Sequence, residues 1–417
     1  MKKLVLLPIF IASLFVSCSS DDDNQGIIVD PLEPVVAPAD YTFTRNNEST
    51  VKFGGQTTRI FMAEEIISAL KGIDTETQSS IQSMFDHLEG ADDFSTPELN
   101  ASGKSVRSKT AASTDYFSAN ASEASEIKAM FDNYITNQTS EVFPNSEVIA
   151  APGVAGQIAD GSSTRYVSAN GLEYNQAFAK GLIGAFVTDQ ILNNYLSPSV
   201  LDGGDNVSNN DSDILDGDNQ YTTMEHKWDE GYGYLFGGVP SIIVDGQTVN
   251  QPNPLTTIGD DDSFLNKYVG KVAGSTSFPT IAQDIFDAFK LGRAAIVAKN
   301  YQIRDEQAMI LKQKISEVIA IRAIYYLQNG KTAVEANDFG GAFHDLSEGY
   351  GFLTSLRFTR DTQTGTSIFT KSDVDGYLND IMSDGPNGLW NVTPQTLDAI
   401  SEDIASRFDF TVAQVTE

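Results

Sequence analysis

One ten-residue pattern occurs twice in this chain and constrains its fold more than any other feature. Residues 226–235 read His-Lys-Trp-Asp-Glu-Gly-Tyr-Gly-Tyr-Leu, and residues 344–353 read His-Asp-Leu-Ser-Glu-Gly-Tyr-Gly-Phe-Leu. The shared form is His-x-x-x-Glu-Gly-Tyr-Gly-aromatic-Leu, and it uses two of only three histidines in the chain. Self-similarity of this kind indicates a duplicated structural unit. The sequence therefore predicts two related halves, each with one copy of the motif.

The spacing of the motif fits a helix. Residues i, i+4 and i+7 share one helical face, so the histidine, the glutamate and the second glycine of each copy point the same way. These residues are His226, Glu230 and Gly233 in the first copy, and His344, Glu348 and Gly351 in the second. A glycine inside a helix costs about 1 kcal/mol relative to alanine. We therefore expect another helix to pack closely against this face.

The repeated pairs allow two chemical interpretations. Two imidazoles and two carboxylates from facing helices, His226, Glu230, His344 and Glu348, could bind Fe, Mn or Zn. Their sequence neighbours Glu225 and Asp345 could then orient the histidines. Alternatively, each His–Glu pair satisfies its own hydrogen bonds and specifies the packing of a duplicated bundle without a metal.

The third histidine, His87, is expected at the end of a helix that carries Ile81, Met84 and Phe85. Interaction with the negative end of that helix explains its presence. The alternative is a third metal ligand.

The loop between Leu201 and Gln220 is rich in carboxylates. Calcium favours oxygen-rich loops of this kind, but the spacing of Asp and Gly does not fit an EF-hand. A calcium site at residues 202–218 and a solvated acidic loop are therefore the two interpretations. The aspartates are Asp202, Asp205, Asp211, Asp213, Asp216 and Asp218.

The N-terminus predicts export and anchoring. A basic start is followed by the apolar run from Leu4 to Val16, which is too short to span a membrane and typical of a signal peptide. Leu14-Phe-Val-Ser-Cys18 resembles the lipobox of bacterial lipoproteins. The resemblance implies cleavage before Cys18, acylation of that residue and a firm anchor in the outer membrane, on its periplasmic face or at the cell surface. Ordinary secretion is the alternative.

Residues 18–40 predict a disordered tether after the 1–17 signal peptide, because they are rich in Asp and Pro and contain little that could pack. Their start, Ser19-Ser-Asp-Asp-Asp23, resembles the surface-export signal of bacterial lipoproteins. The alternative interpretation of this run is a solvated spacer.

Composition limits the partners. The chain has 27 Lys+Arg and 57 Asp+Glu, a formal net charge of −30. So negative a surface repels nucleic acid and anionic lipid headgroups and favours cations. Cys18 is the only cysteine, so disulfides cannot stabilise the exported body.

The apolar spacing predicts an all-α fold, a duplicated helical bundle, with a small N-terminal β-hairpin. We expect one domain over 41–417, made of a first half at about 58–236 and a second half at about 280–410. The hairpin is predicted from alternation at 41–45 and 51–53, and helices from spacing and capping residues. The expected helices lie at 58–70, 74–88, around 127–135, 171–196, 221–236, 281–300, 305–330 and 332–356, followed by two helices capped by Ser372 and Thr393-Pro394.

The stretch from about Tyr41 to Phe358 resembles an uncharacterised family of bacterial lipoproteins, domain-of-unknown-function family 4856. The family has no established activity to carry over. The segments that carry the resemblance are Asn100-Ala-Ser-Gly-Lys-Ser-Val-Arg-Ser-Lys-Thr110, Gly171-Leu-Glu-Tyr-Asn-Gln-Ala-Phe-Ala-Lys-Gly181, Met224-Glu-His-Lys-Trp-Asp-Glu230 and Gly340-Gly-Ala-Phe-His-Asp-Leu-Ser-Glu-Gly-Tyr-Gly351.

A more distant resemblance concerns Gly341-Ala-Phe-His-Asp-Leu-Ser-Glu348, which looks like the Gly-x-His-x-x-Glu motif of imelysin-like proteins. This chain has one additional residue on each side of the histidine. The resemblance implies an exported protein with a pseudo-two-fold arrangement of helical bundles and a role in iron uptake.

These observations lead to three hypotheses. The first is a membrane-anchored, non-enzymatic binding lipoprotein that acquires iron, haem or another metal through the paired helices, together with an outer-membrane uptake partner. The second is a structural or interaction lipoprotein in which the His/Glu pairs only lock the bundle. The third, a metallopeptidase, has less support, because the chain lacks a His-Glu-x-x-His helix. The chain also lacks the Gly-x-Ser-x-Gly turn of serine hydrolases and a phosphate loop. We assign no catalytic residue.

Overall fold

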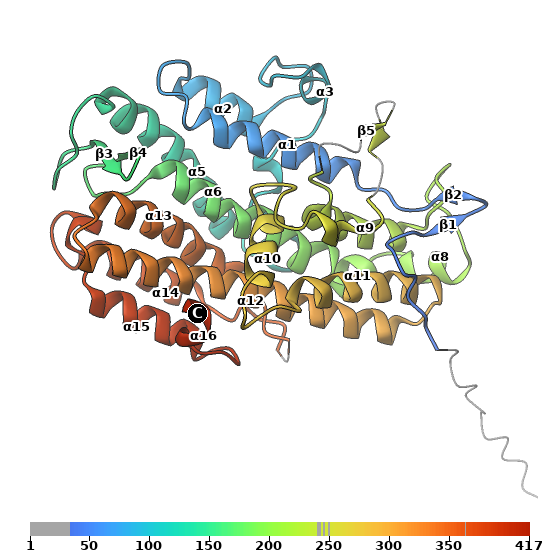
Figure 1. The fold of residues 1–417 in the computed structure, drawn as a ribbon. Coiled ribbons are helices and arrows are strands. Elements are labelled where there is room, and N and C mark those ends of the chain that lie inside the picture. The colour runs from blue at the N-terminus through green and yellow to red at the C-terminus, as the bar shows by residue number, and fades with distance from the viewer. Residues whose placement is uncertain (1–33, 240–242, 245–246, 249–250, 363) are drawn as a thin grey trace, which may run out of the picture. The chain divides into compact units, whose positions relative to one another are not determined.

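The longest helix, α12 (Tyr301–Glu335), runs through the middle of the helical body (Figure 1). In this computed structural model it packs against α11 (Ile281–Val297), α13 (Phe339–Ser355) and α15 (Pro394–Ala405). The structure describes residues 34–417 except 240–242, 245–246, 249–250 and 363. The predicted signal peptide, Cys18 and most of the predicted tether lie outside the described residues. Residues 35–417 form one compact unit.

A second helical run, residues 174–195, is buried from residue 175 to its end. It begins as α6 (Tyr174–Leu182) and continues through two π-helical segments, η4 (Ile183–Thr188) and η5 (Ile191–Tyr195). Small residues in this run, among them Gly181 and Gly184, explain this burial: a side chain at Gly184 would meet Ser355 of α13 at 2.4 Å. A helical run is thus present where the sequence predicts a helix at 171–196, but the apolar spacing gave no sign of the π turns.

The two motif copies lie on α9 (Thr223–Phe236) and α13, as the sequence predicts. The helix α9 packs against η5, α1 (Gly54–Ala69) and α11, and α13 packs against α6, α12 and α14 (Lys371–Ser383). The first-half motif helix thus contacts the second-half helix α11, and the second-half motif helix contacts the first-half helix α6. Helices of the two expected halves therefore contact each other.

Shorter helices and turns complete the body. They are α2 (Gln78–Asp86), α3 (Pro97–Asn100), η1 (Arg107–Lys109), α4 (Thr114–Phe117), α5 (Ala121–Asn137), η2 (Gln138–Val142), η3 (Phe143–Asn145), α7 (Pro198–Leu201), α8 (Asn206–Asp211), η7 (Pro254–Thr256), α10 (Leu265–Ala273), η8 (Leu356–Phe358), η9 (Gly388–Asn391) and α16 (Val412–Thr416).

Strands are few among the described residues, and all pair antiparallel in twos. The predicted N-terminal hairpin is present but shorter, because Asn46 and Asn47 adopt φ of 55° and 66° and close a two-residue turn. The hairpin near residue 160 was not predicted, since its residues do not alternate clearly. The pairs are β1 (Thr44–Arg45) with β2 (Glu48–Ser49), β3 (Gly156–Asp160) with β4 (Ser163–Val167), and β5 (Ile243–Val244) with β6 (Gln247–Thr248).

Several predicted helix boundaries are wrong. The helix α12 begins after the N-cap Asn300 rather than at Asp305, and it continues through Gly330. Gly330 does not stop the helix because it serves packing: a side chain there would meet Leu346 of α13 at 2.5 Å. Thr77 rather than Asp74 caps α2, and Thr370 rather than Ser372 caps α14, each through a capping box. The predicted Thr393-Pro394 cap of α15 is confirmed.

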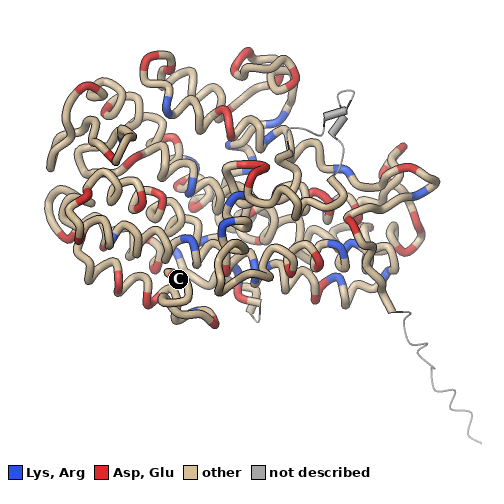
Figure 2. Tube along the Cα trace, in the orientation of Figure 1, with Lys and Arg blue, Asp and Glu red and all other residues tan. Residues whose placement is uncertain are grey.

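Acidic residues are spread over the described chain, and many loops at helix ends carry Asp or Glu (Figure 2). Within the ranges that the structure describes, no helix combines the length and the hydropathy needed to cross a bilayer.

Candidate functional site

Glu348, the glutamate of the second motif copy, is largely buried and paired with a lysine. Its carboxylate lies 3.2 Å from the ammonium of Lys180 on α6, and the two side chains are only 9% and 7% exposed. Burial alone would raise the pKa of Glu348, but Lys180 and a hydrogen bond from Tyr326 of α12 hold that pKa below its usual value. The carboxylate is therefore ionised and compensated at neutral pH.

His344 connects the same carboxylate to a second one. Its Nδ1 lies 3.2 Å from Glu173 and its Nε2 lies 3.8 Å from Glu348. Burial lowers the pKa of the imidazole, but the hydrogen bond to Glu173 and the charges of Glu173 and Glu348 outweigh it and raise the pKa above 6.5. The neighbouring carboxyl of Asp345 has a pKa of about 6, because burial and the charge of Glu348 disfavour its ionised form.

The first motif copy has different surroundings. Glu230 accepts hydrogen bonds from Lys227 at 2.8 Å and from Gln56 of α1 at 3.0 Å. Its histidine, His226, stacks on Tyr221 with ring centroids 4.6 Å apart, and its enclosed Nδ1 has no hydrogen-bond partner. Burial lowers the pKa of His226, and the attraction of Glu230 does not offset this effect.

In both motif copies the glutamate pairs with a lysine, but the two glutamates have different partners. Each motif glutamate meets a lysine and interacts with a tyrosine of a preceding buried helix, Tyr195 or Tyr326. Among the residues that the structure describes, no three His, Cys, Asp or Glu side chains gather closely enough to hold a metal ion. The four motif side chains thus lie in two groups with separate partners, and metal binding stays a prediction.

The sequence placed Glu225 beside His226 as an orienting residue, but Glu225 binds arginines instead. Arg293 of α11 is fully buried and donates to Glu225 at 3.1 Å and to Asp229 at 3.0 Å. The hydroxyl of Tyr41 donates to Asp229 at 2.7 Å, and Arg45 of the hairpin pairs with Glu225 at 2.9 Å. This cluster joins α9 to α11 and to the N-terminal hairpin. Burial raises the pKa of Asp229 to about 6.

Close packing is found at the second motif glycine of both copies, but another helix approaches, as predicted, only at Gly351; the neighbour of Gly233 is Phe53, the N-cap residue of α1. An added Cβ at Gly233 would lie 2.3 Å from Phe53, and one at Gly351 would lie 2.5 Å from Lys180 and 2.8 Å from the backbone of Gly181. The first motif glycine makes only ordinary contacts, with nearest atoms at 3.4 Å for Gly231 and 3.5 Å for Gly349. Gly351 therefore permits the close approach of α6 that puts Lys180 beside Glu348.

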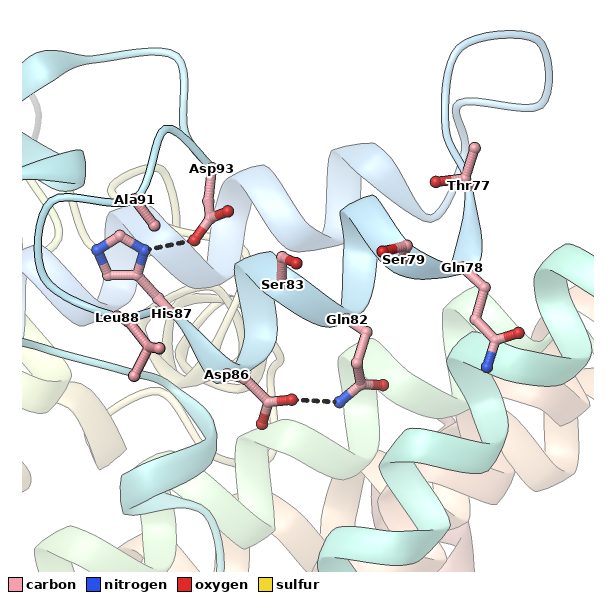
Figure 3. A pocket seen from close by; sticks show the side chains of 10 residues that line it. All are labelled: Thr77, Gln78, Ser79, Gln82, Ser83, Asp86, His87, Leu88, Ala91 and Asp93. Carbon is pink, nitrogen blue, oxygen red and sulfur yellow. Dashed lines mark hydrogen bonds and ion pairs between the residues drawn. The ribbon is translucent and has the colours of Figure 1, made fainter.

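His87 caps the C-terminal end of α2, where the sequence placed it. Its Nδ1 lies 2.8 Å from Asp93, and the two side chains point toward each other (Figure 3). The pair lines a groove of about 590 Å³ together with Gln82 and Ser83. The second imidazole nitrogen, Nε2, is enclosed and has no hydrogen-bond partner. No motif side chain lines this groove.

The acidic loop at 202–218 places several carboxylates on cations and a hydroxyl rather than on one another. Asp202 pairs with Arg304 at 2.6 Å, Asp213 pairs with Lys299 at 3.0 Å, and Asp211 accepts a hydrogen bond from Tyr301. The calcium site stays a prediction.

Sequence reasoning missed Lys180, Glu173 and Arg293, although all three interact with motif-helix residues. A signal existed for Lys180: it is the only charged residue between Glu173 and Asp189 in a helix that small and apolar residues predict to be surrounded. A lysine in such a place needs a carboxylate partner. The sequence contains no indication of which carboxylate that is.

The two glycines of one motif copy should respond oppositely to alanine. We expect Gly351→Ala to lower the free energy of unfolding by about 1–3 kcal/mol, because overpacking outweighs the better helix propensity. Gly349→Ala should be neutral or gain up to about 1 kcal/mol. Chemical denaturation of both variants checks this expectation. Equal effects of the two substitutions would contradict the packing argument.

The histidines of the two copies should titrate on opposite sides of pH 6.5. NMR titration, assigned with His226→Gln and His344→Gln, should show His344 above this value and His226 below it. Because the folded pKa of His344 is raised, its stabilisation is complete below about pH 6.5 and is lost as the pH rises through the folded pKa. If both rings titrated above pH 6.5, or both below it, the opposite pKa shifts expected from their different surroundings would be contradicted.

Comparison with known proteins gives one family. The chain matches the family described as Domain of unknown function (DUF4856) over residues 38–411. No curated protein and no solved structure gives a match. The imelysin-like resemblance therefore stays a resemblance of one motif. Since the match includes both motif helices and nearly all of the helical body, the chain belongs to the DUF4856 family.

Proposed function

We propose that the protein is a lipid-anchored, non-enzymatic structural or interaction lipoprotein in which charged pairs on the motif helices lock two interleaved halves together. One observation carries this proposal: the second-half residues His344 and Glu348 both pair with first-half residues, Glu173 and Lys180. The contact of the second-half Arg293 with Asp229 of the first half supports it. The body held in this way would be presented on a tether that begins at Cys18.

Burial explains why these pairs act as locks. Removing one partner of a buried ion pair leaves an uncompensated charge, which costs about 3–5 kcal/mol. Lys180 and Glu348 are nearly as buried as core residues. An arrangement that separated α6 from α13 but kept one of these charges buried would therefore bear this cost. The pairs therefore specify which helices meet, whereas the apolar core alone would allow other arrangements.

A second candidate is metal binding at His344, in support of iron or haem acquisition. The observation in its favour is that His344 is 22% exposed and lies between two carboxylates. Imidazole and carboxylates suit Fe, Mn or Zn. Against it, the ammonium of Lys180 already neutralises Glu348 and would repel a cation.

Lys180→Met tests the first candidate. We expect it to lower the free energy of unfolding by about 3–5 kcal/mol, because Glu348 is left without its cation. Adding Glu348→Gln should restore most of the loss. Lys227→Met is the matched control, since Lys227 is 31% exposed and its pair with Glu230 should contribute only about 0–1 kcal/mol. Denaturant titration of the four proteins gives these values.

Metal analysis of the purified protein and of a double histidine variant distinguishes the two candidates. A stoichiometric Fe, Mn or Zn in the purified protein that is lost in the His226→Ala/His344→Ala variant would favour the metal site. A small effect of Lys180→Met, equal to that of Lys227→Met, would refute the lock.

The anchor has its own test. We expect Cys18→Ser to move the protein from the membrane fraction to the soluble fraction, because acyl chains on that residue supply the predicted attachment. Fractionation with immunoblotting measures the shift, and metabolic labelling with palmitate shows the acylation directly. Membrane retention of the unlabelled variant would contradict the lipoprotein assignment.

A further inference from the structure

A pocket of about 430 Å³ lies between α4, η5, α12 and the start of α14. It is lined by three cationic side chains, Lys312, Arg360 and Lys371, and by the single carboxylate of Asp115. Its volume falls in the range of small-molecule sites. A local excess of cations is notable in a chain with a formal net charge of −30.

Arg360 is buried, with 5% exposure, and forms no ion pair with a carboxylate among the described residues, although Asp189, Asp115 and Glu123 attract it without contact. Its Nη1 donates to the carbonyl of Thr359 at 3.0 Å and to the hydroxyl of Ser367. The guanidinium lies 4.9 Å from the ring centroid of Tyr116. No described residue accepts a hydrogen bond from its Nε or Nη2, so part of the donor fork is unused where Arg360 borders the pocket.

Lys312 is the second cation without a match. It is partly buried on α12 and makes no hydrogen bond or ion pair within the described part of the chain. Burial lowers the pKa of its ammonium and Arg360 lowers it further, while Asp115 acts in the opposite direction. Lys371, in contrast, pairs with Asp375 and Glu126.

The other buried cations of this chain are compensated in two ways. Arg59 donates to backbone carbonyls and Arg322 lies over tyrosine rings, whereas other arginines meet carboxylates. Arg293 meets Asp229 and Arg357 meets Glu123, each at hydrogen-bond distance. Leaving buried charge without a partner is costly, and a bound anion removes that cost. Arg360 and Lys312 differ from these other cations because both border one pocket, where a bound anion can reach them.

We propose that this pocket binds a small molecule through a carboxylate or phosphate group, which Arg360 and Lys312 hold between them. The planar fork of arginine fits such oxyanions, and lysine supplies a point charge. Asn193 and Thr366 in the lining offer hydrogen bonds to a polar remainder of the ligand. The site shares no residue with the motif helices, so the inference goes beyond the proposed function. It does not depend on the lock between the halves.

Calorimetry of the purified full chain tests the site with three probes: inorganic phosphate, D-glucuronate and uncharged D-glucose. We expect saturable binding of phosphate, glucuronate or both, and none of glucose. Lys312→Met should weaken anion binding by about tenfold or more, because a hydrogen bond between charged groups is lost. The tighter of the two anions identifies the oxyanion that the pocket prefers.

Lys314→Met is the matched control. Lys314 lies on the same helix and pairs with Glu317 at 2.9 Å outside this pocket, so its loss should leave the affinity unchanged. Lys312→Met should leave the stability of the unliganded protein nearly unchanged, since Asp115 and Asp305 attract this ammonium without forming an ion pair with it. Absence of saturable binding of both anions, or equal weakening by both substitutions, would overturn the proposal.

Discussion

The two motif helices carry buried carboxylates, and each of these needs a cation or a hydrogen-bond donor from a neighbouring helix. The motif helices α9 and α13 are buried on most sides, yet both carry carboxylates that stay in the interior. Each carboxylate requires a cation or a donor at hydrogen-bond distance, and these partners come from specific neighbouring helices. Lys180 on α6 and Arg293 on α11 supply the most buried of them. These two ion pairs connect α6 with α13 and α11 with α9, and the proposed lock rests on them.

Glycine and lysine act together in this arrangement. At Gly351 the backbone of α6 approaches so closely that any side chain would collide with Lys180, and the same approach brings the lysine ammonium to Glu348. In the first copy, Gly233 receives Phe53 instead of a helix backbone, and Glu230 takes its cation from Lys227 on its own helix. The duplicated sequence thus keeps the demand for compensation while the source of the cation differs. The opposite pKa shifts of the two histidines have a different cause. Burial dominates at His226, whereas the hydrogen bond to Glu173 and the charges of Glu173 and Glu348 outweigh burial at His344.

Local features of the chain could be predicted from sequence, because they depend on neighbours within a few positions. The helical spacing of α9 and α13, the cap at Thr393-Pro394 and the closeness required at Gly351 are of this kind. Features decided by distant contacts could not. The sequence predicts a helix end at Gly330, because the contact with Leu346 cannot be seen in it. It likewise predicts that Glu225 orients His226, because the ion pair with Arg293 depends on a distant helix. The anchor and tether depend on residues before 34, and their prediction rests on the sequence alone.

The same physical rule separates the two kinds of charged site in this protein. Where a buried cation has a carboxylate, as Lys180 and Arg293 do, the interaction is complete within the chain and its consequence is structural. Where a cation at a pocket has none, as with Lys312 and Arg360, the chain bears an electrostatic cost that a ligand can relieve. A net charge of −30 disfavours anions at long range, so the proposed anionic ligand would gain its attraction within the pocket itself. The motif glutamate Glu348 already has a cationic partner within the chain, whereas Lys312 and Arg360 have no ion pair with any residue that the structure describes and are the groups that we propose bind a ligand.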